Sequence, residues 1–561
     1  MSRSSSKCIA LHSAAALFTV ALAGTLHAQA LPDAGSLLQQ LPPAPAAAPG
    51  PAPTTRIETE RPVKLSGTGK VLVQDLRFSG NTAFDSATLR AVAGEVQGKT
   101  LSFDELQAMA GRITDYYHRH GYPLARAVIA RQNMKDGVLE ISVVEARYGK
   151  VMLANDSAVN SRLLEATLAP LHAGDVIRQA EMDRSLLLLS DLPGAKVEAT
   201  LKAGERPGTS DMTVAVAPAP RVVGNITADN FGSRFTGRGR LGANFSVLGP
   251  LSHGDLFNFS LLSSGESFRY GRASYEAVVN GRGTRLGAAA SALSYELGEP
   301  FATIGAHGQA HVLSAWARQP LLRSRQANVW GSLQYDGLNL KDRVDASAIR
   351  NDRHLDNITL ALNGDLTNAL VANSGNSWSL GLTRGRLDFD DAAARSTDAA
   401  TARTDGSFAK LQGLVSHTQN LTRVDQLYAQ LSGQRASANL DTSMKMSVGG
   451  PWTVRAYEPG AISGDNAWVL NLELRRFLGA LAQTQWQAVA FVDAAHVTVN
   501  KSPWTASTNT GALRGYGLGL NWSGPERIDG RIFVAAPFGA RPALLSSVSP
   551  VRGWAELSKR F

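Results

Sequence analysis

The C-terminal part of the chain, residues 219–561, carries a strand pattern that restricts its fold more than any other feature of the sequence. Short segments of alternating side chains recur between Gly, Asn, Asp and Ser turns, without a long helical pattern. In residues 468–475 one face is Trp, Leu, Leu and Leu, and the other is Val, Asn, Glu and Arg. Residues 485–494 alternate in the same way and place Asp493 on the polar face. Apolar outer faces with charged inner faces predict a membrane β-barrel with a wet lumen.

The length of this region predicts the size of the barrel. At about 21 residues for each strand with its connection, it forms about 16 antiparallel strands that are long enough to cross a bilayer. All nine Trp residues fall within it, from Trp316 to Trp554, and its strand-like tail ends in Phe561, which we interpret as an assembly signal. The alternative, a secreted soluble β-solenoid, explains neither the inverted faces nor the distribution of Trp.

The first 30 residues are predicted to be a secretory signal peptide. Arg3 and Lys7 give a positive start, residues 13–24 form an apolar stretch too short to span a bilayer, and Ala28-Gln29-Ala30 offers a cleavage site. Beyond residue 30, no apolar run is long enough for a membrane-spanning helix. The periplasm, the outer membrane and the exterior therefore remain as destinations.

Cysteine content and charge exclude several classes of protein. The one cysteine, Cys8, lies before the apolar stretch of the signal peptide, so the mature protein has no disulfide framework, cysteine-based zinc site or iron–sulfur cluster. The formal net charge of +9 becomes +7 when Arg3 and Lys7, the only charges of the signal peptide, are subtracted. An excess this small, without a dense run of Lys and Arg, argues against nucleic-acid binding.

Residues 31–70 are predicted to be a short helix followed by a linker. Residues 33–41 favour a brief helix with Asp33 as its N-cap. Six prolines then fall between Pro42 and Pro53, and they favour an extended, polyproline-type conformation. A tether for the helix and a merely disordered N-terminus are both compatible with this composition.

Residues 71–147 and 148–218 are predicted to be two copies of one small α+β module. Both follow the order strand, helix, helix, strand, strand, and Ser102 with Glu105 forms a capping box. The predicted elements are strand 71–78, helices 85–92 and 101–119 and strands 125–129 and 138–144, then strand 150–153, helices 160–168 and 178–189 and strands 195–201 and 213–216. Small sheets of this kind leave edge strands that can bind an extended peptide by strand addition.

These features together resemble a known family. Residues 73–147, with FSGNTAF at 78–84 and YYHRHGYP at 116–123, resemble a POTRA (polypeptide-transport-associated) domain. Two such domains before a barrel that opens with DNFGSRFTG at 229–237 resemble the two-partner secretion transporters of the TpsB type, the ShlB/FhaC/HecB haemolysin secretion/activation family. The resemblance covers most of residues 70–561. It implies two periplasmic POTRA domains and a transmembrane barrel in the outer membrane.

The resemblance also implies a functional site inside the barrel. Val454-Arg455-Ala456-Tyr457 stands where the family has Val-Arg-Gly-Tyr, at the tip of a long loop folded into the lumen. Phe491-Val492-Asp493 matches the Phe-x-Asp strand motif, whose carboxylate meets that arginine. Periodicity independently places Asp493 and Glu473 on the inner face, so Glu473 is a further expected partner. The remaining implied site residues are Asp229, Asn230 and Gly232 at the start of the barrel and Phe561 at its end.

The sequence departs from the family pattern at three places. Ala456 replaces the family's Gly, so a backbone with positive φ would be strained at this position. The predicted N-terminal helix is short beside the lumen-plugging helix of the family. Lys559 interrupts the apolar face that leads to Phe561.

By resemblance, an unfolded exoprotein docks its N-terminal secretion domain on the POTRA edges, crosses the pore and folds outside. The cargo is an adhesin, a haemolysin or a contact-dependent toxin, and outer-membrane lipid and the barrel assembly machinery are the other expected partners.

We predict no catalytic residue, metal or cofactor: GTGK at 67–70 lacks the phosphate-loop spacing, and no Gly-x-Ser-x-Gly elbow is present. The alternatives are a barrel insertase or assembly factor, favoured by more POTRA copies, and a plain porin or adhesin, which needs no periplasmic modules.

Overall fold

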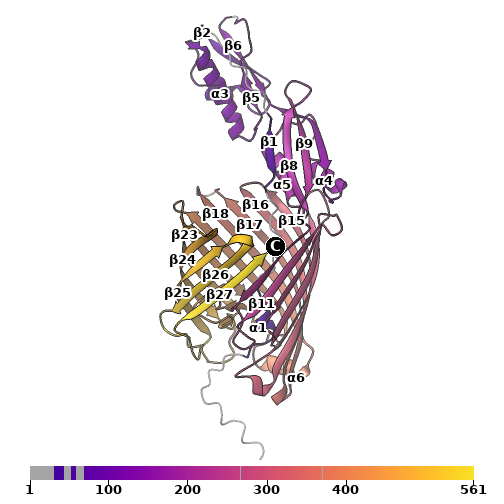
Figure 1. Ribbon diagram of the computed structural model, residues 1–561, viewed down its shortest axis with the longest axis vertical. Coiled ribbons are helices and arrows are strands. Elements are labelled where there is room, and N and C mark those ends of the chain that lie inside the picture. Colours follow the sequence, from indigo (N-terminus) through magenta and orange to yellow (C-terminus); the bar gives the residue numbers. More distant parts are fainter. Residues whose placement is uncertain (1–30, 43–51, 59–68, 135, 266, 369–370) are drawn as a thin grey trace, which may run out of the picture.

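The computed structural model describes residues 31–42, 52–58, 69–134, 136–265, 267–368 and 371–561. Two small α+β domains stand at one end of a closed β-barrel (Figure 1). The barrel has 16 antiparallel strands, so the predicted fold class and strand number are confirmed. The predicted signal peptide, residues 1–30, lies outside the described residues. Among the residues that are described, no helix is long and apolar enough to cross a membrane.

The barrel strands follow one another around the wall in sequence order, and the last closes onto the first. The closing ladder is short, because β27 and β10 pair only over Asn225–Arg560 to Asp229–Glu556. The strands are β10 (Val222–Asp229), β11 (Arg240–Leu248), β12 (Leu256–Ser263), β13 (Phe268–Val278), β14 (Arg285–Glu296), β15 (Ala306–Arg323), β16 (Ala327–Val344), β17 (Ile349–Thr367), β18 (Ser374–Phe389), β19 (Gly406–Asn420), β20 (Asp425–Ala436), β23 (Asn466–Leu481), β24 (Thr484–Thr498), β25 (Thr510–Ser523), β26 (Ile528–Pro537) and β27 (Arg552–Arg560).

The strand faces lie as the alternation predicts. On β23 the outward side chains of Trp468 and Leu474 are 44% and 49% exposed, whereas the inward Val469 and Asn471 are 1% and 6% exposed. On β24 the inward Asp493 is fully buried. Apolar side chains outside and polar side chains inside are the arrangement expected of a barrel that spans a bilayer.

The first domain contains a three-stranded sheet in the order β3-β6-β5 and a separate ribbon of β2 with β4. Its elements are β2 (Lys70–Val73), β3 (Asp75–Ser79), α2 (Ser86–Ala93), β4 (Lys99–Ser102), α3 (Phe103–Arg119), β5 (Arg126–Val128) and β6 (Val138–Val144). The prediction of one strand over residues 71–78 was wrong, because the N–H of Gln74 leaves the ladder and donates to Gly137 at 2.8 Å. The predicted capping box is confirmed: Ser102 caps α3, and Glu105 reaches back to it.

The second domain repeats the order strand, helix, helix, strand, strand. Its elements are β7 (Arg147–Asn155), α4 (Ser161–Leu168), α5 (Gln179–Ser190), β8 (Ala195–Ala203) and β9 (Thr209–Pro218). In both domains the strand that directly precedes the first helix, β3 or β7, pairs in parallel with the last strand, which pairs antiparallel with the strand before it. One further strand, β1 (Thr54–Ile57), comes from the segment predicted to be only a linker, and it extends this sheet to the order β1-β8-β9-β7.

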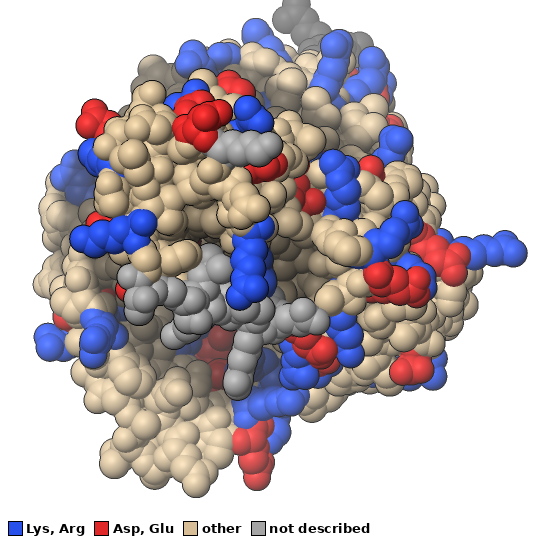
Figure 2. Space-filling model, turned by 90° about the horizontal axis from the view of Figure 1, so that it is seen from above, with Lys and Arg blue, Asp and Glu red and all other residues tan. Residues whose placement is uncertain are grey.

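The charges at the domain end of the molecule are of mixed sign. Seen from this end, Lys and Arg side chains are interspersed with Asp and Glu (Figure 2). Several of them form exposed pairs within the two domains, such as Arg90–Asp75 at 3.1 Å and Lys196–Glu198 at 3.5 Å. This mixture fits the small net charge and gives a peptide partner both donors and acceptors.

A buried carboxylate, Glu145, stabilises the first domain. It accepts hydrogen bonds from the N–H groups of Thr82 and Ala83 at 2.7 and 2.8 Å and from the Tyr117 hydroxyl at 2.9 Å. Burial alone would raise the pKa of Glu145, but these hydrogen bonds to the charged form outweigh it and lower the pKa. The ionised form therefore stabilises the domain above the ordinary Glu pKa of about 4.3, and this contribution is lost as the pH falls through the lowered value.

We expect Glu145→Gln to lower the free energy of unfolding of this domain by about 1.5–3 kcal/mol at pH 7, because hydrogen bonds to a charged group contribute about that much. The difference from wild type should shrink as the pH falls from the ordinary Glu pKa of about 4.3 through the lowered pKa of Glu145, because wild-type Glu145 becomes protonated over this interval. Limited proteolysis of the full chain over a pH series measures both effects. Glu140→Gln, a change of an exposed carboxylate on β6, is the control. A difference that is the same at pH 7 and pH 3 would contradict the assignment.

Candidate functional site in the barrel lumen

The connection between β20 and β23, residues 437–465, folds into the barrel, and we call it the lumen loop. Within it β21 (Met446–Val448) pairs antiparallel with β22 (Ile462–Gly464) and forms a short hairpin. At its tip a turn closes where the N–H of Tyr457 donates to the Val454 carbonyl at 3.1 Å. All four residues of the tip motif, Val454, Arg455, Ala456 and Tyr457, are buried.

Arg455 at this tip contacts two acidic side chains of the barrel wall. Its Nε and Nη2 donate to the two carboxylate oxygens of Asp493 at 2.9 and 2.7 Å, and its backbone N–H donates to the same carboxylate at 3.0 Å. Its Nη1 donates to Glu473 at 2.6 Å. Arg455 is 4% exposed and Asp493 is fully buried. A desolvated, two-pronged contact of this kind fixes the orientation of the loop as well as its position.

Three further residues complete this contact. Asn471 donates to Asp493 at 2.7 Å and to the Thr453 carbonyl at 2.6 Å, and Trp554 donates to the Arg455 carbonyl at 2.7 Å. The guanidinium carbon lies 3.5 Å from the centre of the Phe491 ring, within the range of a cation–π interaction. The loop tip is thereby joined to β23, β24 and the closing strand β27. Asn471 shares the inward face with Glu473, whereas nothing in the sequence indicates that Trp554 contacts the tip.

The expectation of backbone strain at Ala456 is wrong. Ala456 is not among the residues with positive φ, so its backbone does not require glycine. Space for its methyl group comes from the adjacent strand of the wall, β25: a Cβ on Gly515 would lie 2.6 Å from the Cβ of Ala456. Gly515 pairs directly with Asp493 across β24 and β25. A glycine in the wall thus makes room for the alanine in the loop.

Asp229, Asn230 and Gly232 open the barrel in sequence, but they lie where β10 ends, away from the two domains. Asp229 forms a buried ion pair with Arg240 at 2.8 Å. Asn230 donates to the Gly553 carbonyl at 3.1 Å and accepts from the N–H of Ala555 at 2.9 Å. A Cβ on Gly232 would lie 2.0 Å from the Gly237 carbonyl, so only glycine fits. This motif fastens β10 to β27 at the end of their short ladder, and the hydrogen bonds described for Asp229 and Asn230 do not include Arg455.

Phe561 extends the same closure at the other end of the seam. Its N–H donates to the Gly224 carbonyl at 3.0 Å and its carbonyl accepts from the Gly224 N–H at 3.1 Å. Its ring lies 5.8 Å from that of Phe245. Lys559, which interrupts the apolar face, pairs with Glu526 at 2.8 Å.

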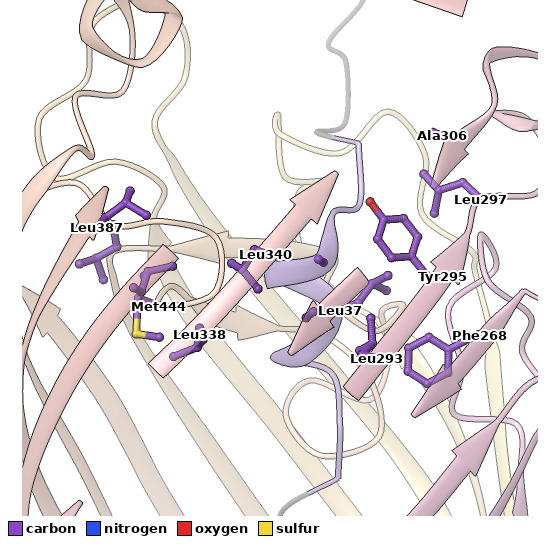
Figure 3. Packing of buried hydrophobic residues seen from close by; sticks show 14 of the residues in the cluster. Leu37, Phe268, Leu293, Tyr295, Leu297, Ala306, Leu338, Leu340, Leu387 and Met444 are labelled. Carbon is purple, nitrogen blue, oxygen red and sulfur yellow. The ribbon is translucent and has the colours of Figure 1, made fainter. Parts of the chain in front are cut away.

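A short helix, α1 (Ala34–Leu38), lies inside the barrel, and the sequence did not place it there. Asp33 caps it as predicted, although the helix is shorter than residues 33–41. Leu37 is 2% exposed and packs among lumen-facing side chains that include Leu293, Tyr295 and Leu340 (Figure 3). A helix of five residues has little stability of its own, so the surrounding barrel holds it in place.

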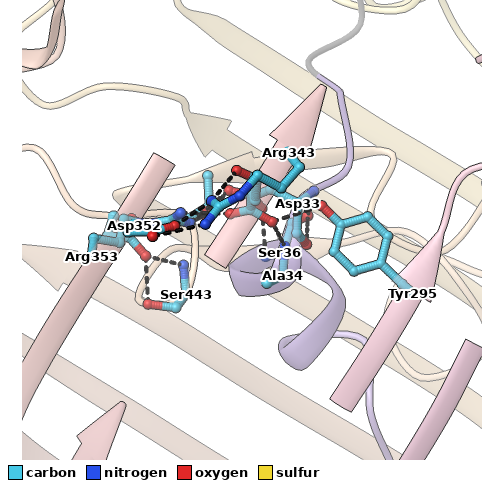
Figure 4. Close-up of polar contacts among 11 residues, drawn as sticks. Asp33, Ala34, Ser36, Tyr295, Arg343, Asp352, Arg353 and Ser443 are labelled. Carbon is cyan, nitrogen blue, oxygen red and sulfur yellow. Dashed lines mark hydrogen bonds and ion pairs between the residues drawn. The ribbon is translucent and has the colours of Figure 1, made fainter. Parts of the chain in front are cut away.

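One arginine of the wall binds the cap of this helix. Arg353 donates to Asp33 at 2.9 Å, to Asp342 at 2.6 Å and to Asp441 at 2.6 Å, and its side chain is 1% exposed (Figure 4). The Tyr295 hydroxyl donates to Asp342 at 2.6 Å, and the N–H of Ala34 donates to the same carboxylate at 2.8 Å. We call Arg353, Asp33, Asp342 and Asp441 the Arg353 cluster.

The Arg353 cluster also joins α1 to the lumen loop, because Asp441 belongs to that loop. The Thr442 hydroxyl donates to Asp33 at 2.6 Å, and the Gln39 amide donates to the Ser443 carbonyl. Gly35 lies so close that a Cβ would be 2.5 Å from the Thr442 hydroxyl. The helix and the loop therefore contact each other inside the lumen.

Comparison with known proteins identifies the family to which this arrangement belongs. The chain matches the family described as haemolysin secretion/activation protein ShlB/FhaC/HecB over residues 208–522 and the ShlB-type POTRA domain over residues 71–146. It is 25% identical to the heme/hemopexin transporter protein HuxB of Haemophilus influenzae strain 86-028NP over 78% of each chain. It is 28% identical to the outer membrane transporter CdiB of Escherichia coli over 36% of this chain and 33% of that one.

Solved structures share the fold. CdiB from Escherichia coli matches with a TM-score of 0.70 at 21% identity, over 90% of this chain and 93% of that chain. BamA from Haemophilus ducreyi, lacking POTRA domains 1–3, matches with a TM-score of 0.52 at 12% identity, over 87% of this chain and all of that one. Since the family match spans more than half of the sequence, the chain belongs to the haemolysin secretion/activation family, the TpsB-type two-partner secretion transporters of the outer membrane, with its POTRA region in the periplasm.

Proposed function

We propose that this transporter captures one large, unfolded exoprotein in the periplasm and passes it through the barrel after α1 and the lumen loop have moved. The observation that carries this proposal is how the lumen is filled. Ion pairs and hydrogen bonds to the wall at Arg353, Glu473 and Asp493 hold the cap of α1 and the tip of the lumen loop. Apolar contacts of Leu37 in the helix, and of Val454 and Tyr457 in the loop, lie beside them. Polar contacts can be exchanged for water or for an extended chain, whereas a fully apolar core would have to be exposed.

In this proposal Arg455 and Asp493 hold the tip of the lumen loop in the conformation that keeps the pore competent, with Glu473 as the second partner. α1 closes the barrel until cargo arrives. The two domains, residues 71–147 and 148–218, supply the strand edges on which the cargo docks. The C-terminal strand that ends in Phe561 supplies the signal that the barrel assembly machinery reads, and the apolar outer face contacts outer-membrane lipid.

The cargo is an exoprotein with an N-terminal secretion domain. Relatives carry names that point to different cargo: HuxB is a heme/hemopexin transporter, and HpmB of Proteus mirabilis is a hemolysin transporter. An adhesin, a haemolysin and a contact-dependent toxin all share the chemistry that this site requires, which is a long unfolded chain with a strand-forming N-terminal region.

Deletion of the gene, followed by paired proteomes of the culture supernatant and the outer membrane, tests this function. We expect one or two very large proteins to fall at least tenfold in the medium, while the profile of other outer-membrane barrels is unchanged. Complementation with the wild-type gene is the control. A broad fall in outer-membrane barrels would contradict the proposal and would make the protein an assembly factor.

A further inference from the structure

The strand β1 lies on the edge of the second domain. It pairs in parallel with β8, in register from Thr54–Glu198 to Ile57–Leu201, and the N–H of Glu58 extends the ladder to the Leu201 carbonyl at 2.9 Å. Among the described residues β8 otherwise pairs only with β9. The N-terminal segment of the chain therefore occupies the edge at which strand addition would take place.

This edge offers more than β1 uses. β8 has nine residues, whereas the ladder with β1 covers four of them. In the first domain the strand in the corresponding position, β5, has three residues. Because the number of backbone hydrogen bonds grows with the length of the ladder, a long partner strand gains more on β8 than on β5.

The side chains of β1 hold it in place only weakly. Ile57 is 40% exposed. Glu58 and Lys202 form an ion pair at 3.4 Å, with side chains 49% and 60% exposed, and exposed pairs of this kind contribute little. A long hydrogen bond joins β1 to the barrel, with Arg325 donating to the Thr55 hydroxyl at 3.5 Å.

The residues of β8 define the strand that could replace β1. Val197, Ala199 and Leu201 are buried on one face, and Glu198 and Lys202 are exposed on the other. A matching strand runs parallel to β8, with small or β-branched apolar residues beside the buried face and polar residues of either charge beside the exposed one. The sequence of β1, Thr-Thr-Arg-Ile, is a short version of this pattern.

We propose that β1 is an internal latch on the cargo-binding edge: a strand of the exoprotein's secretion domain pairs with β8 in the parallel orientation and displaces β1. This inference rests on the proposed secretion function and adds to it the docking strand, its direction and a competitor within the chain. The occupant that we assign is a longer strand of the cargo, because it can pair with the residues of β8 that β1 leaves uncovered.

The latch also connects cargo docking with the lumen. Residues 39–53 join α1, held by the Arg353 cluster, to β1, held on β8. When both ends are bound, this tether has two fixed points. Release of β1 removes one of these two fixed points, so the cargo strand that opens the edge also changes how the helix in the lumen is held.

A disulfide across the ladder tests the latch. Thr54 and Glu198 are direct partners on adjacent strands, at a spacing that disulfides bridge. The periplasm is oxidising, and the mature chain has no other cysteine. In cells whose only copy is T54C/E198C, we expect secretion of the exoprotein identified by the deletion experiment to fall at least tenfold, and to return to within about twofold of wild type when a reductant is added.

The matched control crosslinks β8 to its other neighbour. T200C/T213C joins paired residues of β8 and β9 and leaves the edge open, so secretion should stay at the wild-type level. Undiminished secretion by fully oxidised T54C/E198C would overturn the latch while the secretion function stands, since the wild type secretes in the same assay. Failure of the wild type to secrete any exoprotein would overturn both.

A second variant separates a latch from a merely structural strand. Because the N–H of Glu58 points at β8, the period of two makes the N–H of Arg56 point there as well. Arg56→Pro removes this donor, and Arg56→Ala retains it. If β1 is a latch, the full-length Arg56→Pro transporter in detergent should capture severalfold more exoprotein than the wild type. Arg56→Ala should capture as much as the wild type. A fall in capture would show that β1 supports the docking surface, and would overturn the proposal.

Discussion

Replacing Arg455 with Ala is expected to leave a folded barrel in the outer membrane and to reduce secretion of the exoprotein at least tenfold. The substitution leaves Asp493, which is fully buried, without a cation, and leaves Glu473 with Arg475 as its remaining ion-pair partner. Removing one partner of a buried ion pair costs about 3–5 kcal/mol. This cost destabilises the position of the loop tip and not the wall, because the wall strands are joined by backbone hydrogen bonds in which the Arg455 side chain takes no part. The lumen loop should therefore leave its position while the wall stays closed.

Two measurements on the same membranes separate the loop from the wall. Exoprotein in the medium reports secretion, and the shift in gel mobility between heated and unheated samples reports a folded barrel. Arg475→Ala is the matched control, because Arg475 also pairs with Glu473, at 2.7 Å, but is not a partner of Asp493 in the lumen contact. Arg455→Lys should recover little, since an ammonium group cannot reproduce the two-pronged contact. Normal secretion by Arg455→Ala would contradict the assignment, and loss of the heat-modifiable barrel would give this pair a purely structural role.

The parts of this structure that could be predicted from the sequence depend on neighbours in the chain. The inward position of Asp493 follows from the alternation along a single strand. The caps Asp33 and Ser102 follow from residues within one helical turn, and both accept the expected hydrogen bonds. Arg455 at the loop tip was identified from a motif of the family, and its partner Asp493 lies where the family's Phe-x-Asp motif implies.

The parts that could not be predicted depend on partners far along the chain. Asp33 is bound by Arg353, which is 320 positions away, and no local pattern places a short helix inside a barrel. The strand β1 follows a run of prolines and pairs with β8. The sequence of β8 does not indicate that a strand from another part of the chain pairs with it. At Ala456 the family motif predicted strain, but the compensating residue, Gly515, is on another strand. Each of these features is fixed by a contact that forms only when the barrel and domains are assembled.

Replacing Arg353 with Gln is expected to release α1 and to convert a closed barrel into a conducting pore. Without the guanidinium group, Asp33, Asp342 and Asp441 are three carboxylates around one buried position with no cation between them. Leaving buried charge unpaired costs about 3–5 kcal/mol, whereas burial of Leu37 contributes about 1.5–3 kcal/mol. Because a change of about 1.4 kcal/mol shifts an equilibrium tenfold, the ratio of barrels with α1 inside to barrels with α1 outside should fall roughly a hundredfold or more.

Conductance of the purified protein in planar bilayers measures this release, and we expect long-lived open states in Arg353→Gln at voltages where the wild type is mostly closed. Arg343→Gln is the matched control: Arg343 pairs with Asp352 beside the cluster and does not bind Asp33. Adding Asp33→Asn to Arg353→Gln should restore part of the closure, because it removes the carboxylate that belongs to the helix itself. If Arg353→Gln conducts like the wild type, the cluster does not hold the helix, and the closure must rest on the apolar contacts of Leu37 and on the lumen loop. The double variant separates the charge of the cluster from the apolar contacts, since the residues around Leu37 are the same in all three proteins and only the charges at Arg353 and Asp33 differ.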